Sequence, residues 1–312
     1  MKRNTITDSI ISISDEETFV NEQSLCSVIS EAEEVKKKTK NVSFALAEYL
    51  QKNEKVSQAI SVKNCGSFLM FKQFKDKEQT AVLSKANFCK NPLCPMCEHR
   101  RAMNDFNILK ETLALSQRTY TYHLVLAVPN VRKLKKEHLL NLKSKAVYFI
   151  TKKLKKDSYY SSLEITYTRE EGFHPHLHVL LTTDNYISVS ESYIKQMSHC
   201  WKTVYNKSDT EHEGYTFFIK GIKSDNELHE MTKYIVKAEK TEHIIDAIEK
   251  GLPFAIHGVR KNSSGGEIKV LIKQAKSLIK KENTDRLDIL SEFDYFYRIF
   301  EFLTGKEKYV EK

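Results

Sequence analysis

The chain contains 312 residues, 40% of them hydrophobic and 29% charged, which suits one substantial core with appendages or two modest domains. Its small share of glycine and proline excludes a low-complexity chain. No stretch approaches the roughly 18 apolar residues of a membrane span, and residues 1–20 lack the apolar centre of a signal peptide. We therefore expect a cytoplasmic protein without a membrane partner, whose six cysteines stay reduced.

Positive charge is concentrated in one part of the chain. The net charge is +9, and residues 132–156 carry ten Lys or Arg against one acidic residue, Glu137. Tyrosines accompany this segment, and a basic surface with aromatic side chains is typical of nucleic-acid binding. The alternative is a solvated helix face without a ligand.

The first 118 residues divide into two predicted segments. Residues 1–55 form a polar N-terminal extension that is loose to about residue 40 and then helical over residues 42–58. Residues 56–118 form a cysteine-rich, zinc-binding segment. The sequence predicts strands at residues 68–71 and 80–83 and a helix at residues 101–115.

Residues 119–275 alternate predicted strands with predicted helices and form the third segment. The strands are expected at residues 120–128, 160–168, 177–181 and 216–222, and the helices at residues 135–155, 189–205 and 225–240. The short loop at residues 169–172 predicts an antiparallel hairpin. The fold class is therefore α+β, with a central antiparallel sheet flanked by helices.

Residues 276–312 are predicted to form a C-terminal helical segment. Helices are expected at residues 268–280 and 286–303, and the second carries an amphipathic stripe that would serve as core or interface.

Three cysteines lie close together in the second segment. Cys89, Cys94 and Cys97 form a C-x4-C-x2-C pattern, and Cys65 stands upstream. Four thiolates suit a tetrahedral structural Zn²⁺, because the C-x2-C step folds tightly around the metal. A redox site or chance spacing is the alternative.

Two histidines and one glutamate in the predicted hairpin offer a second metal site. His176 and His178 are two residues apart on a strand, so their side chains project from the same face. Glu164 on the preceding strand can lie opposite them and complete a two-histidine, one-carboxylate set. Alternatively, the histidines are buried or solvated without a metal and Glu164 faces solvent.

A tyrosine follows with polar neighbours at helical spacing. The predicted helix over residues 225–240 places Glu230, Tyr234 and Lys237 on one face, with Lys233 beside them. Cationic neighbours and a metal favour the phenolate of a tyrosine nucleophile. The alternative is packing with an ordinary i,i+4 contact.

Five motifs in order, C-x4-CPMC, HLVLAVPN, LEITY, HPHLHVLL and E-x2-KYxxK, resemble the rolling-circle replication initiators of small Gram-positive plasmids. These Rep proteins belong to the HUH endonuclease superfamily, and the resemblance covers about residues 60–275. Residues 1–55 and those after about 280 match nothing in that family, and Asn262-Ser263-Ser264 interrupts a stretch that the family makes more apolar.

The resemblance implies a role for each of these site residues. Tyr234 matches the nucleophile that forms a 5′-phosphotyrosine, and Glu230 matches the glutamate that activates water when replication terminates. His176 and His178 match the metal ligands, Glu164 is the looser third match, and His174 would support them by a hydrogen bond. The zinc ligands match Cys89, Cys94 and Cys97, with Cys65 as the fourth.

The resemblance also implies a reaction and partners. The protein would nick one strand of plasmid double-strand origin DNA, single-stranded or hairpin at the nick, leave a 3′-OH primer, and rejoin strands at termination. Its cofactors would be Mg²⁺ or Mn²⁺ for catalysis and structural Zn²⁺, with bacterial host helicase and DNA polymerase as partners. The alternatives are an HUH relaxase, a single-tyrosine transposase, or a non-enzymatic zinc protein that binds nucleic acid.

Overall fold

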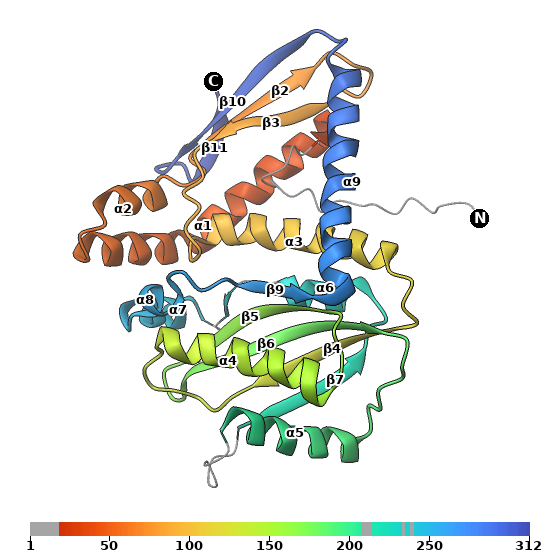
Figure 1. The fold of residues 1–312 in the computed structure, drawn as a ribbon. Helices are drawn as coiled ribbons and strands as arrows, with labels where there is room; N and C mark the ends of the chain where they lie inside the picture. Colours follow the sequence, from red (N-terminus) through yellow and green to blue (C-terminus); the bar gives the residue numbers. More distant parts are fainter. Residues whose placement is uncertain (1–18, 207–213, 233–234, 238–239) are drawn as a thin grey trace. The chain divides into compact units, whose positions relative to one another are not determined.

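A computed structural model of the chain describes residues 19–206, 214–232, 235–237 and 240–312. The fold is α+β, as predicted, and divides into two compact units, Met1–Asn104 with Ile279–Lys312 and Asp105–Leu278 (Figure 1). The unit boundaries fall inside the helices α3 (Pro95–Leu115) and α9 (Gly266–Leu290). Among the described residues, no helix combines the length and apolar composition needed to cross a membrane.

The second unit is built on a sheet with strand order β7-β4-β6-β5-β8, and β9 also pairs with β5. A tight turn joins β5 to β6, so these two strands form the predicted antiparallel hairpin, in which Glu164 pairs with His176. The described part of β8 is short and runs parallel to β5. The strand bounds are β4 (Tyr120–Ala127), β5 (Tyr159–Thr168), β6 (Gly172–Thr183), β7 (Thr216–Gly221), β8 (Val236–Lys237) and β9 (Asn262–Gly265).

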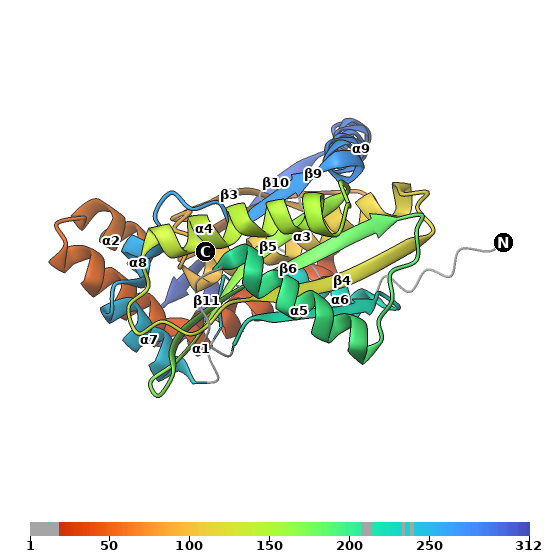
Figure 2. The ribbon, with the colours of Figure 1, turned by 60° about the horizontal axis from the view of Figure 1, so that its bottom comes forward.

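One face of this sheet packs its apolar side chains under two helices, α4 (Lys136–Tyr148) and α5 (Glu191–Tyr205) (Figure 2). A π-helical turn, η1 (Phe149–Lys153), continues α4 and places the Phe149 ring 5.5 Å from that of Trp201. The Trp201 indole donates a hydrogen bond of 2.7 Å to the carbonyl oxygen of Ala127. These contacts make this face the main hydrophobic core of the unit.

The opposite face carries the site and is only partly covered. Leu180 and Tyr160 pack there against α6 (Asp225–Thr232) and against residues of α3 and α9. The short helices α7 (Thr241–Glu249) and α8 (Leu252–Ile256) follow β8, and the Tyr167 hydroxyl of β5 donates a hydrogen bond to Asp246 of α7. The β5–β6 hairpin is therefore contacted by α6 and by α7 as well as by residues of α3 and α9.

The first unit has a second antiparallel sheet, with strand order β1-β3-β2-β10-β11. Its core face packs against the apolar stripe of α1, including Leu25, Val28 and Ile29. The remaining bounds in this unit are β1 (Phe19–Val20), α1 (Glu22–Lys52), α2 (Val56–Lys63), β2 (Phe68–Phe74), β3 (Ala81–Ala86), β10 (Tyr295–Leu303) and β11 (Lys308–Glu311).

Three predictions of local structure were wrong. The loose extension is helical from Glu22 onward, because an apolar stripe of α1 is buried against the sheet. The C-terminal helix expected over residues 286–303 is instead the end of α9 followed by β10, which pairs with β2. The helix expected over residues 225–240 ends at Thr232, because the β-branched Val236 pairs with Ile165 of β5.

Candidate functional site

Glu164, His176 and His178 form one cluster on a single face of the second unit's sheet. Glu164 on β5 pairs directly with His176 on β6, and His178 lies two residues further along the same strand. The Nε2 atoms of His176 and His178 each lie 3.3 Å from a different carboxylate oxygen of Glu164. The structure therefore brings together the three predicted ligands, with one ligand atom of each within 4.8 Å of the others.

The cluster has the chemistry of a divalent-cation site. Glu164 is only 4% exposed. Burial opposes its ionisation, yet the contacts with the rings of His176 and His178 outweigh burial and hold the pKa of the carboxyl well below its usual range. Ligand bonds of about 2.0–2.2 Å place neighbouring ligand atoms about 3.0–3.5 Å apart, in agreement with the observed spacing. The Nε2 atom of His178 is buried, and Glu164, 3.3 Å away, is the group that it faces.

A third histidine, which the sequence analysis did not single out, supports His178 from the neighbouring strand. His123 on β4 is 4% exposed, and its Nε2 lies 2.8 Å from Nδ1 of His178. If His178 binds a metal through Nε2, its Nδ1–H donates to His123, which fixes the ring orientation. Burial, with the nearby charges of His178 and Lys220, lowers the pKa of His123 to about 4, so it stays neutral and able to accept.

His174 supports the cluster in a different way from the one expected. Its backbone carbonyl oxygen, rather than its ring, lies 3.3 Å from Nδ1 of His176. The two rings are tilted neighbours with centroids 5.3 Å apart. The Nδ1 atoms of both predicted histidine ligands thus face a hydrogen-bonding group, leaving Nε2 of each directed at Glu164.

The residues predicted to act with the tyrosine lie on two elements instead of one helix. Glu230 is half-buried on α6, whereas Lys237 is exposed on β8, where it pairs with Thr166 on the face that carries Glu164. The backbone N–H of Ile165 donates a hydrogen bond of 2.8 Å to the carbonyl oxygen of Ile235. Lys233 and Tyr234 lie outside the described residues.

The four predicted zinc ligands come together in the first unit. Cys97 at the start of α3 has its Sγ 3.6 Å from that of Cys65 and 3.7 Å from that of Cys89. All four thiols, including Cys94, lie within 4.8 Å of one another, and Zn–S bonds of about 2.3 Å require sulfur–sulfur distances of about 3.8 Å. The other thiols lower the pKa of Cys97, and a hydrogen bond from the Lys90 N–H adds to this. The cluster therefore fits a closed tetrahedral metal site, including the fourth ligand Cys65.

Both clusters belong to a chain with recognisable relatives. The family described as replication protein matches residues 80–297. The chain belongs to the replication protein family. Relatives called Protein rep include one from Lactiplantibacillus plantarum, 28% identical over 84% of this chain and 86% of the relative. A second, from Lentilactobacillus hilgardii, is 30% identical over 76% of this chain and 81% of the relative. A third, from Staphylococcus aureus, is 28% identical over 64% of this chain and 89% of the relative. No solved structure matches the chain.

The resemblance to plasmid Rep proteins, which the motifs carry, is thereby confirmed. The matched stretch of the replication protein includes the glutamate–histidine cluster, three of the four cysteines and the segment around Tyr234. Asn262 of the unusual Asn262-Ser263-Ser264 stretch donates a hydrogen bond of 2.7 Å to Asp105, and the stretch lies in β9, which pairs with β5. Its polar side chains thus belong to a strand edge rather than to an apolar core.

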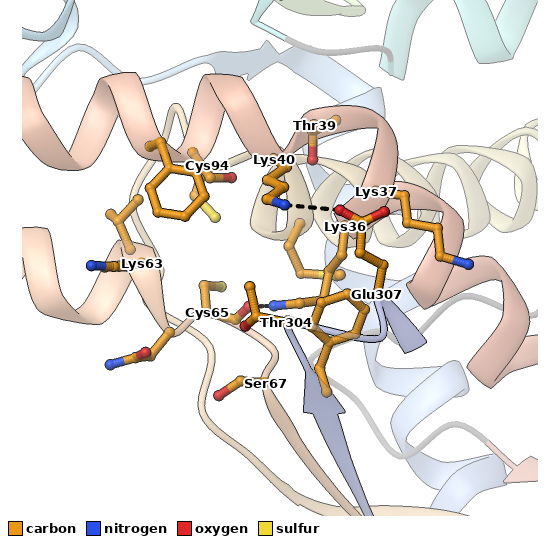
Figure 3. Close-up of a pocket in the computed structure, with 16 residues that line it drawn as sticks. Lys36, Lys37, Thr39, Lys40, Lys63, Cys65, Ser67, Cys94, Thr304 and Glu307 are labelled. Atoms are coloured by element: carbon orange, nitrogen blue, oxygen red, sulfur yellow. Dashed lines mark hydrogen bonds and ion pairs between the residues drawn. The ribbon is translucent and has the colours of Figure 1, made fainter. Parts of the chain in front are cut away.

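Lysines gather beside the cysteine cluster of this replication protein. A pocket of about 90 Å³ is lined by Cys65 and Cys94 together with lysines of α1 and α2 (Figure 3). Lys36 donates a hydrogen bond of 2.7 Å to the Cys65 carbonyl, and Lys40 forms an ion pair of 2.8 Å with Glu307. Burial lowers the pKa of Lys36. These lysines therefore help to hold the cluster against α1.

The basic segment at residues 132–156 forms α4, η1 and their flanking loops. Most of its positive side chains are exposed, as a nucleic-acid surface requires. Lys143 is an exception, because it is half-buried and donates hydrogen bonds of 2.5 Å and 3.2 Å to the carbonyl oxygens of Arg260 and Lys261. The exposed members are Arg132, Lys133, Lys135, Lys152, Lys153 and Lys155.

Proposed function

We propose that this replication protein initiates rolling-circle replication of a plasmid by nicking one strand at the double-strand origin. The observation that carries the proposal is the Glu164–His176–His178 cluster, three buried or nearly buried ligands on one sheet face. A second observation supports it: Ile235, the residue after Tyr234 in the sequence, is hydrogen-bonded to Ile165, the neighbour of Glu164. This contact supports a role for the Glu230–Lys237 segment at the proposed metal site.

The proposed reaction is a transesterification at one phosphodiester. The Tyr234 hydroxyl oxygen bonds to phosphorus, the bond from phosphorus to O3′ breaks, and the hydroxyl proton passes to the released 3′-oxygen. The products are a 5′-phosphotyrosine and a free 3′-OH, which primes a host polymerase. A divalent ion held by the cluster would polarise the scissile phosphate. His123 and the His174 carbonyl keep the two imidazoles oriented for that role.

Termination requires a second cut by a chain with a single proposed nucleophile. Glu230, half-buried on α6, would direct a water molecule at the phosphodiester and accept its proton. The water oxygen would bond to phosphorus, the bond from phosphorus to O3′ would break, and the released 3′-oxygen would take up the proton. Lys237, exposed on β8 beside Thr166, and Lys233 would neutralise charge on the phosphate under attack. The exposed lysines of residues 132–156 would hold the DNA backbone, which carries the negative charge that attracts them.

The decisive experiment is mass spectrometry of the peptide linked to a suicide oligonucleotide that carries the origin nick site. We expect a single adduct on Tyr234, absent after chelation of divalent ions and absent in Tyr234→Phe. Tyr186→Phe serves as the matched control, because Tyr186 is an exposed tyrosine of the same unit. An adduct on another residue would overturn the assignment of the nucleophile. No adduct with any substrate would favour the non-enzymatic nucleic-acid-binding alternative.

A further inference from the structure

The sheet of the first unit leaves aromatic side chains exposed on the face opposite α1. Tyr295 and Tyr297 on β10 are 48% and 50% exposed. They pair with Phe74 and Lys72 of β2, and directly paired residues of antiparallel strands share a face. Of the intervening positions, Phe300 and Phe71 point to the core, where their rings pack edge to face with centroids 6.0 Å apart. The two tyrosines therefore belong to an open face, which we call the tyrosine face.

Part of the tyrosine face is covered and part is not. Leu287 and Leu290, at the end of α9, pack on Phe74 and Val82 at one corner. Beyond that corner, Met70 and Ile299 are only half-buried. The half-exposed tyrosine rings present flat apolar surface with a polar tip to solvent, a shape on which another flat ring can stack.

Lysines are interleaved with the rings of the tyrosine face. The Lys72 ammonium lies 3.8 Å from the centroid of the Tyr295 ring, a cation–π contact that orients the ring. The Tyr295 and Tyr297 rings are neighbours, with centroids 5.6 Å apart. Lys85 is exposed opposite Met70, and Lys308 is exposed opposite Leu303. Among the side chains that the strand pairing assigns to this face, positive charge exceeds the negative charge of Glu301.

We propose that the tyrosine face is a binding platform for single-stranded DNA, separate from the nicking site. Aromatic side chains on an open sheet stack bases of any sequence, and lysines between them contact the phosphates. The excess of lysine on this face, beside flat rings, complements the phosphates and bases of a single strand, and complementary potential selects a partner. The inference rests on the proposed function only for the source of the ligand, because nicking and strand displacement generate single strands.

The test measures fluorescence anisotropy of a labelled oligothymidylate, which contains no origin sequence, with the full chain. Tyr295→Ala/Tyr297→Ala should weaken the affinity by roughly tenfold for each base that loses a ring. Tyr295→Phe/Tyr297→Phe should bind like the parent, because stacking needs the ring and not the hydroxyl. Tyr186→Ala, which removes an exposed tyrosine from the other unit, is the matched control and should change nothing.

Salt dependence separates phosphate contact from a merely structural role. Lys85→Gln should lower the slope of log affinity against log salt by about 0.7. Unchanged affinity in the alanine variant would overturn the proposal, as would equal loss in the phenylalanine variant. A parent dimer that becomes monomeric in the alanine variant, measured by sedimentation, would overturn it in favour of an interface between two copies of the chain.

The binding test and the nicking test can be read separately. Tyr234→Phe should lose the covalent adduct but keep oligothymidylate binding, whereas the tyrosine-face alanine variant should still form the adduct on a short oligonucleotide. Loss of adduct formation in the parent protein, with binding retained, would sink the proposed function and leave the platform intact. Absence of oligothymidylate binding in the parent protein, with the adduct still formed, would sink the platform and leave the proposed function intact.

Discussion

The cysteine cluster and the glutamate–histidine cluster could each hold a metal ion, but they differ in how many ligands they offer. Cys65, Cys89, Cys94 and Cys97 supply four ligands at tetrahedral spacing, so the set is closed. Glu164, His176 and His178 would supply three ligands from one side of a sheet, which would leave room at the site for a substrate. The number of ligands and their placement therefore distinguish a site suited to a structural metal from a site suited to a catalytic metal.

The two clusters also differ in how the chain assembles them. Three of the cysteines lie in a turn and at the start of α3, whereas Cys65 approaches from the segment before β2. The glutamate and histidines depend instead on the register of the β5–β6 hairpin, where a slip of one residue would turn Glu164 to the other face. We therefore expect substitutions in the two clusters to have different effects.

The largest expected effect is on stability and follows from loss of the cysteine cluster. Cys97→Ser removes a buried ligand that contacts two other thiols, and because metal binding is coupled to folding, the free energy of unfolding should fall by several kcal/mol. Zinc content and the hydrogen-exchange protection of β2 and β10 measure the effect. Cys26→Ser, at an exposed cysteine, is the control and should alter neither. Full zinc content in Cys97→Ser would show that the cluster is not the zinc site.

The next effect concerns the glutamate–histidine cluster and should appear in the cleavage rate rather than in the stability of the protein. Glu164→Gln keeps the shape of the side chain but removes the negative charge, so cleavage of supercoiled origin DNA should fall on the order of 10³-fold. The melting temperature should change by only a few degrees. Glu170→Gln, in the exposed turn of the same hairpin, is the control. Cleavage at the parental rate in Glu164→Gln would remove the carboxylate from the site.

A smaller effect tests whether His123 positions His178. His123→Leu removes the group 2.8 Å from Nδ1 of His178, so the concentration of Mn²⁺ that half-saturates cleavage should rise about 10- to 100-fold. The maximal rate at saturating Mn²⁺ should fall less. His123→Gln retains a hydrogen-bond acceptor and should recover most of the affinity. Equal Mn²⁺ requirements in the leucine variant and the parent would show that His178 is oriented by other contacts.

The smallest effect concerns Lys143 of α4, which donates hydrogen bonds to the carbonyl oxygens of Arg260 and Lys261. Burial, with the nearby charge of Arg260, lowers the pKa of Lys143 to about 8 from 10.5. At a pH between these two pKa values, Lys143 is protonated in the unfolded chain but has released its proton in the folded protein. The free energy of unfolding should therefore rise with pH by about 1 kcal/mol over this range. Urea unfolding of the parent and of Lys143→Gln at about pH 7.5 and about pH 9.5 measures the difference. The same pH slope in both proteins would contradict the prediction.

Both ligand clusters could be predicted from the sequence because their signals are local. The spacing of His176 and His178 and the short turn before them indicated a hairpin that brings Glu164 alongside. The C-x2-C step indicated the knuckle around Cys94 and Cys97. Within each cluster the residues are near in sequence or joined by one turn, except Cys65, which lies 24 residues before Cys89, so few alternative pairings compete.

Other parts of the molecule depend on distant pairing that has no local signal. The stripe of aromatic residues after Arg286 fits a helix as well as a strand, and pairing with β2, more than 200 residues earlier, selects β10. The same competition ends α6 at Thr232, since Val236 pairs with β5. His123 is one polar residue in an apolar strand, and only the β4–β6 register brings it to His178.

Residue types and short spacings therefore predicted the α+β class, the family resemblance and the two groups of side chains that come together in the structure. Strand pairing between distant segments settled which face each ligand occupies, which histidine supports His178, and that the C-terminal aromatic residues form a sheet face instead of a helix. The physical reason is that side-chain chemistry and short turns are encoded locally, whereas helix or strand at an ambiguous apolar stretch is decided by the partner that buries it.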